Sequence, residues 1–203
     1  MHEKYLDGFD PTRCALLAMD FQTSIIQAIG DCAPLLKSTG MAMKAVRRAG
    51  GKVAYVRVAF QPEEVQAFPS HSAMGARIRA AGSRMLADSP ATTILEDIAP
   101  LPGDIVVRKK RVGSFSTTGL HFALKEAGIE TLALAGVHTS GVILSTAREA
   151  HDLDYRVVVL SDCCADPDTN MHEFLLDRIF PKQAAVWSAM QFADLLALHQ
   201  ASI

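Results

Sequence analysis

The sequence lacks any long run of charge of one sign. Its 203 residues carry 20 Lys and Arg against 22 Asp and Glu, for a formal net charge of −2, and nowhere do five like charges stand in a row. Proteins that bind a phosphate backbone need a basic patch or tail. Nucleic acid is therefore not expected as a partner.

Long hydrophobic runs are also missing. A membrane-spanning helix needs about 20 consecutive apolar residues, and no segment of this chain approaches that length. The N-terminal stretch MHEKYLDGFD has no charged start followed by an apolar run, which is the pattern of a secretory leader. We therefore expect a cytoplasmic protein without membrane contact.

Cysteine is scarce, and its spacing does not suit metal binding. Cys14, Cys32, Cys163 and Cys164 form no CxxC pair, and the two adjacent cysteines cannot easily bridge. A structural zinc site of the usual kind is not indicated, and a reducing compartment is the simplest interpretation. No cofactor is expected.

What the chain does have is apolar material in a regular pattern. Hydrophobic residues make up 49% of it, enough for one core, and the length fits a single domain over residues 1–203. Short apolar runs alternate with stretches of helical spacing, which indicates βα units, and strands rich in Val, Ile, Leu and Ala indicate burial on both faces. The predicted fold is an α/β three-layer αβα sandwich around a six-stranded parallel sheet. The predicted strands are residues 14–20, 52–59, 104–110, 131–136, 156–162 and 184–188, and the predicted helices are residues 33–49, 117–127, 140–152, 169–178 and 189–199.

One segment, residues 60–103, interrupts this alternation. It holds five of the nine prolines and no long periodic element. A connection of this length inside a compact domain usually forms a lid, a binding loop or a subunit contact. We expect one of these roles for it.

Charged side chains gather where the predicted strands end. Asp20 ends the first strand, the cations at residues 108–111 end the third, and Gly136 ends the fourth. Open parallel sheets bind ligands at the carboxyl ends of their strands, so these groups are expected to converge. Strand alternation places Lys109 and Arg111 on one face and the other two cations on the opposite face.

Asp20 has two interpretations. It follows five apolar residues, so its carboxylate is expected to lie partly desolvated at the edge of the sheet. Burial raises a carboxyl pKa and a nearby cation lowers it, a balance that suits proton exchange near neutral pH. Alternatively, Asp20 caps the next helix or pairs structurally with a cation of the third strand. Its position alone leaves both interpretations open.

The sequence resembles the isochorismatase-like, or cysteine hydrolase, superfamily in three motifs that occur in order. These are DFQ after the first strand, KKRVGSF before a helix, and GVHTSGV before another. Further similarity in VRVAFQP, RVVVLSDCCAD and HEFLLDRIFP extends the resemblance through nearly the whole chain. It implies the Rossmann-like isochorismatase fold and hydrolysis of a small-molecule substrate.

The resemblance implies a catalytic set of an aspartate, a lysine and a cysteine. Asp20 matches the aspartate, and Lys109, six residues before Phe115, matches the lysine. Val142 stands at the position of the cysteine. Valine has no lone pair and cannot form a thioester, so covalent cysteine hydrolysis at this position is excluded.

The resemblance also implies that hydrolysis without the sulfur is feasible. True isochorismatases look like members of the family in which glycine stands at the cysteine position. Asp20 would then act as general acid or base, with Lys109 stabilising negative charge or tuning the pKa of Asp20. Val142 occupies space that glycine leaves open, so isochorismate itself is a poor candidate substrate.

The turn after the fourth strand carries further implications of the resemblance. A cis peptide bond is implied between Val137 and His138. It would direct the backbone N–H groups of Gly141 and Val142 into the pocket, where they and the helix dipole form an oxyanion site. Further candidate pocket residues are Gln22, Phe115 and Ser140.

A serine and two cysteines at the same edge are alternative candidate nucleophiles. Ser140 has His138 close by in sequence, but the elbow signature GxSxG is not met. Thr139 and Ser140 are residue types that cap helices, which is the favoured interpretation. Cys163 and Cys164 end the fifth strand and are interpreted as buried small apolar residues.

A metal site is not expected. For the nicotinamidase branch of the family, the resemblance implies a metal site formed by an aspartate and histidines after the second strand. This chain has VRVAFQPEEV at that place. His71 alone is too little for zinc or iron. His172, on the helix after the fifth strand, is interpreted as a surface or interface residue rather than a catalyst.

Two functions remain open. The first is an enzyme in which Asp20 and Lys109 direct water or a proton at a small polar substrate. The second is a catalytically silent member of the family that serves as a binding or assembly protein. Asp20 and Lys109 favour the enzyme, and Val142 favours the silent form.

A homodimer or higher homo-oligomer is expected for either function. The resemblance implies such assemblies. Residues 60–90 add apolar and aromatic side chains, such as Phe60 and Phe68, that are expected at the surface. The number of subunits does not follow from the sequence.

Overall fold

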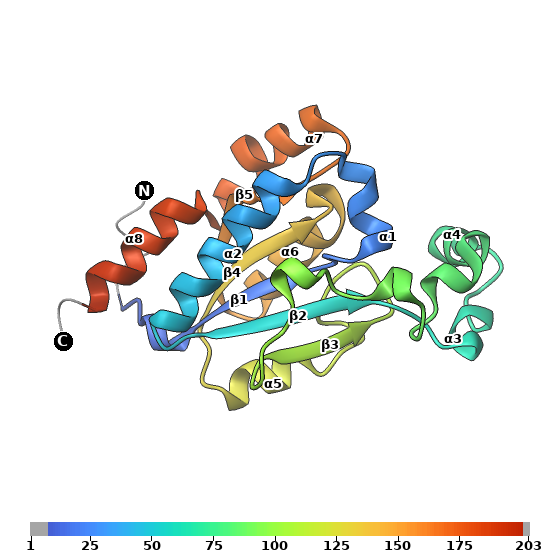
Figure 1. Cartoon of the computed structure of the whole chain (residues 1–203), viewed down its shortest axis with the longest axis horizontal. Coiled ribbons are helices and arrows are strands. Elements are labelled where there is room, and N and C mark those ends of the chain that lie inside the picture. Colours follow the sequence, from blue (N-terminus) through green and yellow to red (C-terminus); the bar gives the residue numbers. More distant parts are fainter. Residues whose placement is uncertain (1–7, 201–203) are drawn as a thin grey trace.

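The six predicted strands form one parallel sheet. In the computed structural model, which describes residues 8–200, the strand order is β3-β2-β1-β4-β5-β6. The central strands β1 and β4 pair along their whole length (Figure 1). The strands are β1 (Cys14–Met19), β2 (Lys52–Val58), β3 (Ile105–Lys109), β4 (Thr131–Val137), β5 (Arg156–Ala165) and β6 (Ala185–Trp187).

Helices cover both faces of the sheet, which confirms the predicted three-layer αβα sandwich (Figure 1). One face carries α2 (Ala33–Arg48) and α8 (Ala189–Gln200), and the other carries α5 (Leu120–Glu126) and α6 (Leu144–Asp152). The remaining helices are α1 (Thr23–Ile26), α3 (Pro62–Gln66), α4 (Ala73–Ala81) and α7 (Thr169–Phe174). None of the helices described between residues 8 and 200 is long and apolar enough to cross a membrane.

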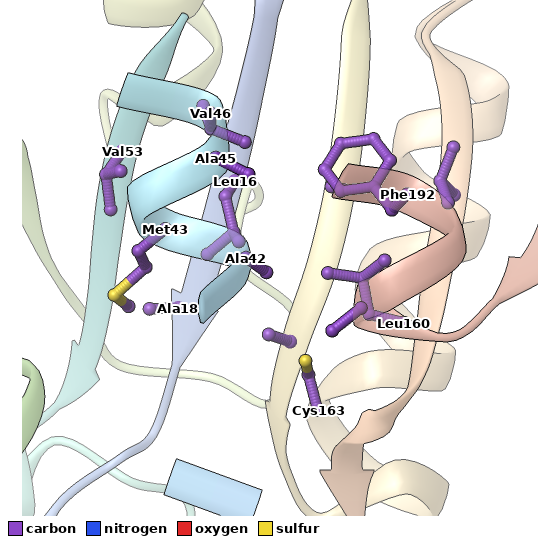
Figure 2. Close-up of a cluster of buried hydrophobic side chains, with 14 of the residues drawn as sticks. Leu16, Ala18, Ala42, Met43, Ala45, Val46, Val53, Leu160, Cys163 and Phe192 are labelled. Carbon is purple, nitrogen blue, oxygen red and sulfur yellow. The ribbon is translucent and has the colours of Figure 1, made fainter. Parts of the chain in front are cut away.

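Helix α2 shows why the chain folds onto the sheet. Its buried residues recur at helical spacing, so one stripe of the helix faces the strands. Figure 2 shows Met43 and Val46 of this stripe lying over Leu16 of β1 and Val53 of β2. Full burial of a side chain of this size contributes roughly 1.5–3 kcal/mol. The packing holds β1 in place and therefore fixes the position of Asp20 at its end.

Strand β5 runs further than predicted, to Ala165. Its pairing with β4 shifts register between Leu134 and Gly136, after which Gly136 pairs with Cys164. The helix after β4 also differs, because it begins as a π-helical turn over Thr139–Ile143 before α6. Both departures lie at the carboxyl edge, where the candidate site is expected.

Gly136 is required by the close approach of β4 to β1. Its φ is +153°, and a Cβ atom built on it would lie 2.3 Å from the Met19 carbonyl oxygen. We expect Gly136→Ala to lower the free energy of unfolding by about 2–3 kcal/mol, because backbone must shift to relieve the overlap. Urea denaturation measures this change. Gly40→Ala is the matched control: nothing lies within 4 Å of its Cβ position, and a loss of similar size there would contradict the steric explanation.

The segment 60–103 builds a small core of its own. Phe60 and Phe68 are buried and pack edge to face, with ring centroids 5.6 Å apart, beside Ile78 and Met85. The prediction that these two rings lie at the surface is therefore wrong. The apolar residues of the segment are used to pack α3 and α4, which stand beyond the end of β2 in Figure 1.

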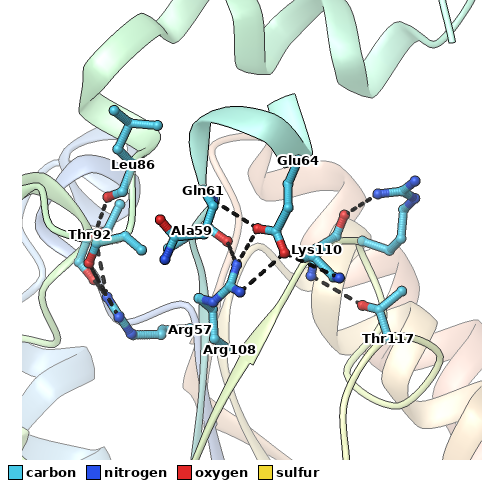
Figure 3. Close-up of polar contacts among 11 residues, drawn as sticks. Arg57, Ala59, Gln61, Glu64, Leu86, Thr92, Arg108, Lys110 and Thr117 are labelled. Carbon is cyan, nitrogen blue, oxygen red and sulfur yellow. Dashed lines mark hydrogen bonds and ion pairs between the residues drawn. The ribbon is translucent and has the colours of Figure 1, made fainter. Parts of the chain in front are cut away.

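Arg108 ties this segment to the sheet. Its guanidinium donates to the Ala59 carbonyl oxygen over 2.9 Å and pairs with Glu64 of α3 (Figure 3). The Lys110 Nζ atom lies 3.2 Å from the same carboxylate. Arg108 and Lys110 therefore share one face, as the strand alternation predicts. Arg111 follows the strand and lies over the Phe68 ring.

The pairing of Glu64 predicts a pH dependence of stability. Hydrogen bonding from Arg108 lowers the pKa of Glu64 to about 2. A folded pKa below the unfolded value gives stability that is complete above about pH 4.5 and is lost as the pH falls through about 2. We expect Glu64→Gln to remove on the order of 1 kcal/mol near neutral pH and to flatten the acid limb of the stability profile. Urea unfolding across this range tests it, with the exposed neighbour Glu63→Gln as control; an equally steep limb in Glu64→Gln would refute it.

Candidate active site

Asp20 lies at the carboxyl end of β1, in the middle of the sheet. Its φ is +58°, a left-handed conformation that aspartate and asparagine adopt more readily than most residues. Its N–H donates to the Val56 carbonyl oxygen over 2.9 Å, which ties the turn to β2. The residue is 6% exposed. The carboxyl group is therefore held in a nearly dry position.

Lys109 reaches Asp20 from the end of β3. Its Nζ atom lies 2.7 Å from Oδ2 of Asp20 and donates to the Val112 carbonyl oxygen over 2.7 Å. Lys109 is 1% exposed, so the ion pair is closed to solvent in the single chain. Burial raises the pKa of Asp20, and the charge of Lys109 offsets part of that rise. The structure thus brings together the two residues that were predicted to converge.

The turn after β4 faces the same edge. The peptide bond between Val137 and His138 is cis. Val142 is 3% exposed and belongs to the hydrophobic cluster that contains Met19. The N–H of Gly141 donates to the His138 carbonyl oxygen over 3.1 Å. The expectation that this N–H is directed into the pocket is therefore wrong, because the turn itself uses it.

Thr139 and Ser140 do not cap the helix, so that prediction is wrong. The Thr139 hydroxyl lies 2.8 Å from Nδ1 of His172, and both the N–H and the hydroxyl of Ser140 donate to Asp166, over 2.8 and 2.6 Å. His172 is thus packed partly buried against the turn, and this burial lowers its pKa. Sequence reasoning missed Asp166 as a partner of the turn. Its place directly after β5, at the carboxyl edge of the sheet, is the signal for it.

Gln22 and Phe115 have structural roles instead of lining a pocket at Asp20. Gln22 is fully buried, and its amide donates to the carbonyl oxygens of Val58 and Thr92 and accepts from the Val58 N–H. No donor of this amide is left for a substrate. Phe115 stacks on Tyr155 and borders a separate cavity of about 350 Å³, whose lining includes neither Asp20 nor Lys109.

The cysteines at this edge are inert by burial. Cys163 and Cys164 are at most 4% exposed, and burial raises the pKa of both thiols well above the usual range. The Cys164 thiol points at the Leu134 carbonyl oxygen, 3.6 Å away. Their interpretation as buried apolar residues is confirmed. Within residues 8–200, no three His, Cys, Asp or Glu side chains are grouped closely enough to hold a metal ion.

His138 contributes a functional group that sequence reasoning considered only as part of the turn and as a neighbour of Ser140. Its Nε2 atom is buried and has no hydrogen-bond partner among the described residues, and the same holds for Oδ1 of Asp20. Burial raises the pKa of Asp20, and the charges of Lys109 and, to a smaller extent, His138 offset part of that rise. His138 thus leaves one buried ring nitrogen unused at the carboxyl edge of the sheet.

Comparison with known proteins agrees with this geometry. Residues 14–191 match the isochorismatase domain family. The chain is 28% identical to the uncharacterized isochorismatase family protein YecD of Escherichia coli O157:H7, covering 90% of this chain and 95% of that protein. It is 29% identical to maleamate amidohydrolase of Pseudomonas putida, covering 85% and 81%. The solved structure of an isochorismatase family protein from Burkholderia thailandensis superposes with a TM-score of 0.80 at 28% identity, covering 93% and 97%.

Proposed function

Because the chain belongs to the isochorismatase family, we propose that it hydrolyses a small amide without a cysteine nucleophile. Asp20 acts as general acid or base, and Lys109 is its electrostatic partner. The observation that carries this proposal is the buried ion pair, 2.7 Å between Nζ and Oδ2, at the carboxyl ends of β1 and β3. A relative that is named maleamate amidohydrolase supports an amide as the substrate class.

Water must be the nucleophile in this proposal. Val142 offers no lone pair, the thiols of Cys163 and Cys164 are buried, and Ser140 donates its hydroxyl proton to Asp166. Water attacks the amide carbonyl carbon, and negative charge develops on the carbonyl oxygen. The ammonium group of Lys109 stabilises that charge, an effect strengthened by the low dielectric of a buried site. Asp20 transfers a proton during this step or to the leaving nitrogen.

A hydrolysis screen of the purified protein tests the proposal. The panel contains maleamate, other small primary amides, isochorismate and simple vinyl ethers, with ammonia release and carboxylate formation as readouts. We expect turnover of at least one amide and none of isochorismate, because Val142 occupies space that a larger substrate needs. Turnover of a vinyl ether with no amide hydrolysed would contradict the amide assignment.

A catalytically silent binding protein is the second candidate, favoured by the closure of the site. Asp20, Lys109 and Val142 are all at most 6% exposed. If the protein is silent, no compound of the panel is turned over, and Val142→Cys gains amidase activity by restoring a nucleophile beside the ion pair. If the protein is a water-dependent hydrolase, the wild type already turns over an amide.

We also propose that the protein is cytoplasmic and self-associates as a homodimer or higher homo-oligomer. The balanced charge and the family resemblance support this. So do large apolar side chains that remain exposed outside the segment 60–103, namely Phe122, Phe174, Met190 and Leu198. Size-exclusion chromatography with light scattering tests it, and a monomer at micromolar concentration would refute self-association.

A further inference from the structure

Two buried polar atoms of the candidate site have no hydrogen-bond partner among the described residues. They are Oδ1 of Asp20 and Nε2 of His138. Buried polar groups are nearly always paired in folded proteins, and exceptions gather at sites of binding or catalysis. The other carboxylate oxygen of Asp20 is held by Lys109. One acceptor of Asp20 and one ring nitrogen of His138 therefore remain for a ligand.

The topology places both residues at the same edge of the sheet, at the ends of neighbouring strands. Strands β1 and β4 are neighbours, with Met19 paired to Gly136, so Asp20 and His138 follow the ends of adjacent strands. The electrostatic effect of His138 on the carboxyl of Asp20 is consistent with this closeness. His138 thus stands beside the ion pair, on the side opposite to β2.

We propose that His138 is the general base that activates the attacking water. This inference rests on the proposed hydrolase function and deepens it by dividing the proton transfers between two residues. Hydrolysis of an amide needs one proton removed from water and one delivered to the leaving nitrogen. Histidine is the side chain used most often for proton removal near neutral pH. Asp20, whose Oδ1 atom is free to accept this proton, delivers it to the leaving group.

The proton and electron balance is complete with these groups. Nε2 of His138 takes a proton from water as the water oxygen bonds to the amide carbon, and the carbonyl π electrons move onto the oxygen beside Lys109. His138 passes this proton to the free Oδ1 atom of Asp20. When the intermediate collapses, the electrons restore the carbonyl, the carbon–nitrogen bond breaks, and Asp20 gives the proton to the nitrogen. Asp20 is then ionised again and His138 neutral, and the products are a carboxylic acid and an amine or ammonia.

Other side chains at this edge are already committed. Nδ1 of His172 is bonded to the Thr139 hydroxyl, and Ser140 donates to Asp166. His138 is the histidine of the site whose Nε2 atom is both buried and unpaired. In the absence of a cysteine, water is the nucleophile, and His138 is the base that activates it.

The test uses the amide identified by the screen and two variants, His138→Ala and His138→Gln. We expect kcat to fall about 10²–10⁴-fold in both, with KM changing less than about threefold. Added imidazole should restore part of kcat in His138→Ala, where the removed ring leaves space, and not in His138→Gln. Thermal unfolding verifies that both variants fold, and His151→Ala on the exposed face of α6 is the matched control.

The outcomes separate this inference from the proposed function. Turnover that survives His138→Ala at the wild-type rate overturns the role of His138 and leaves the hydrolase proposal intact. A loss of kcat that imidazole does not restore assigns His138 a structural role and also overturns the inference. Absence of turnover by the wild type on every compound overturns the proposed function, and the role of His138 fails with it.

Discussion

Replacing Lys109 by methionine is expected to lower the free energy of unfolding by about 3–5 kcal/mol near neutral pH. Methionine fills much of the same volume but leaves the carboxylate of Asp20 without its partner in a site that is 6% exposed. Removal of one member of a buried ion pair is costly because the remaining charge has lost its water and its counter-charge. Urea denaturation followed by circular dichroism measures the loss.

The pH dependence of this variant identifies the cause. Without Lys109, burial is opposed only by the weaker effect of His138, so the folded pKa of Asp20 rises further above the unfolded value. Stability from such a group is complete below the unfolded pKa and is lost as the pH rises through the folded pKa. The deficit of Lys109→Met should therefore shrink as the pH is lowered. Asp20→Asn combined with Lys109→Met should recover most of the loss, and an equal deficit at all pH values would rule out an unpaired carboxylate as the cause.

Asp20→Asn is expected to lower kcat by about 10³-fold or more while the protein stays folded. Asparagine tolerates the φ of +58° at this position and can still accept a hydrogen bond from Lys109, but it cannot exchange a proton. Alanine would confound the result by straining the backbone. Steady-state kinetics on the amide from the screen measures the effect.

The matched control for this variant is Asp177→Asn, the same change at an exposed position. It is expected to keep wild-type kcat. If Asp20→Asn also retained wild-type turnover, Asp20 would be a structural partner of Lys109, the alternative that its sequence position left open.

The layered fold was predictable because strands and helices differ in the spacing of their apolar residues along the sequence. Near-continuous apolar runs marked all six strands, and α2 shows its buried stripe at helical spacing. Helices α3 and α4 were missed because the segment 60–103 shows no long periodic element, and their apolar residues pack into a small cluster around Phe60 instead of onto the sheet. The extension of β5 was missed because it depends on a register shift opposite Gly136.

The candidate site was predictable in part from strand topology. A parallel sheet brings Asp20 and the cations at the end of β3 to one edge, and the family resemblance identifies Lys109 among those cations. The hydrogen-bond partners of Ser140 and Gln22 were not predictable. Ser140 donates to a carboxylate 26 residues away, and Gln22 donates to a carbonyl oxygen 36 residues away. Such contacts depend on loop conformation, for which a residue type gives only a local preference.

The rate of amide hydrolysis before and after treatment with iodoacetamide distinguishes water from a thiol as the nucleophile. Amide hydrolysis that uses water, Asp20 and Lys109 should be unchanged by the reagent, because Val142 cannot be alkylated and Cys14, Cys163 and Cys164 are buried. Mass spectrometry of the treated protein shows which thiols have reacted. Inactivation in step with alkylation of one cysteine would contradict the account and assign catalysis to a thiol.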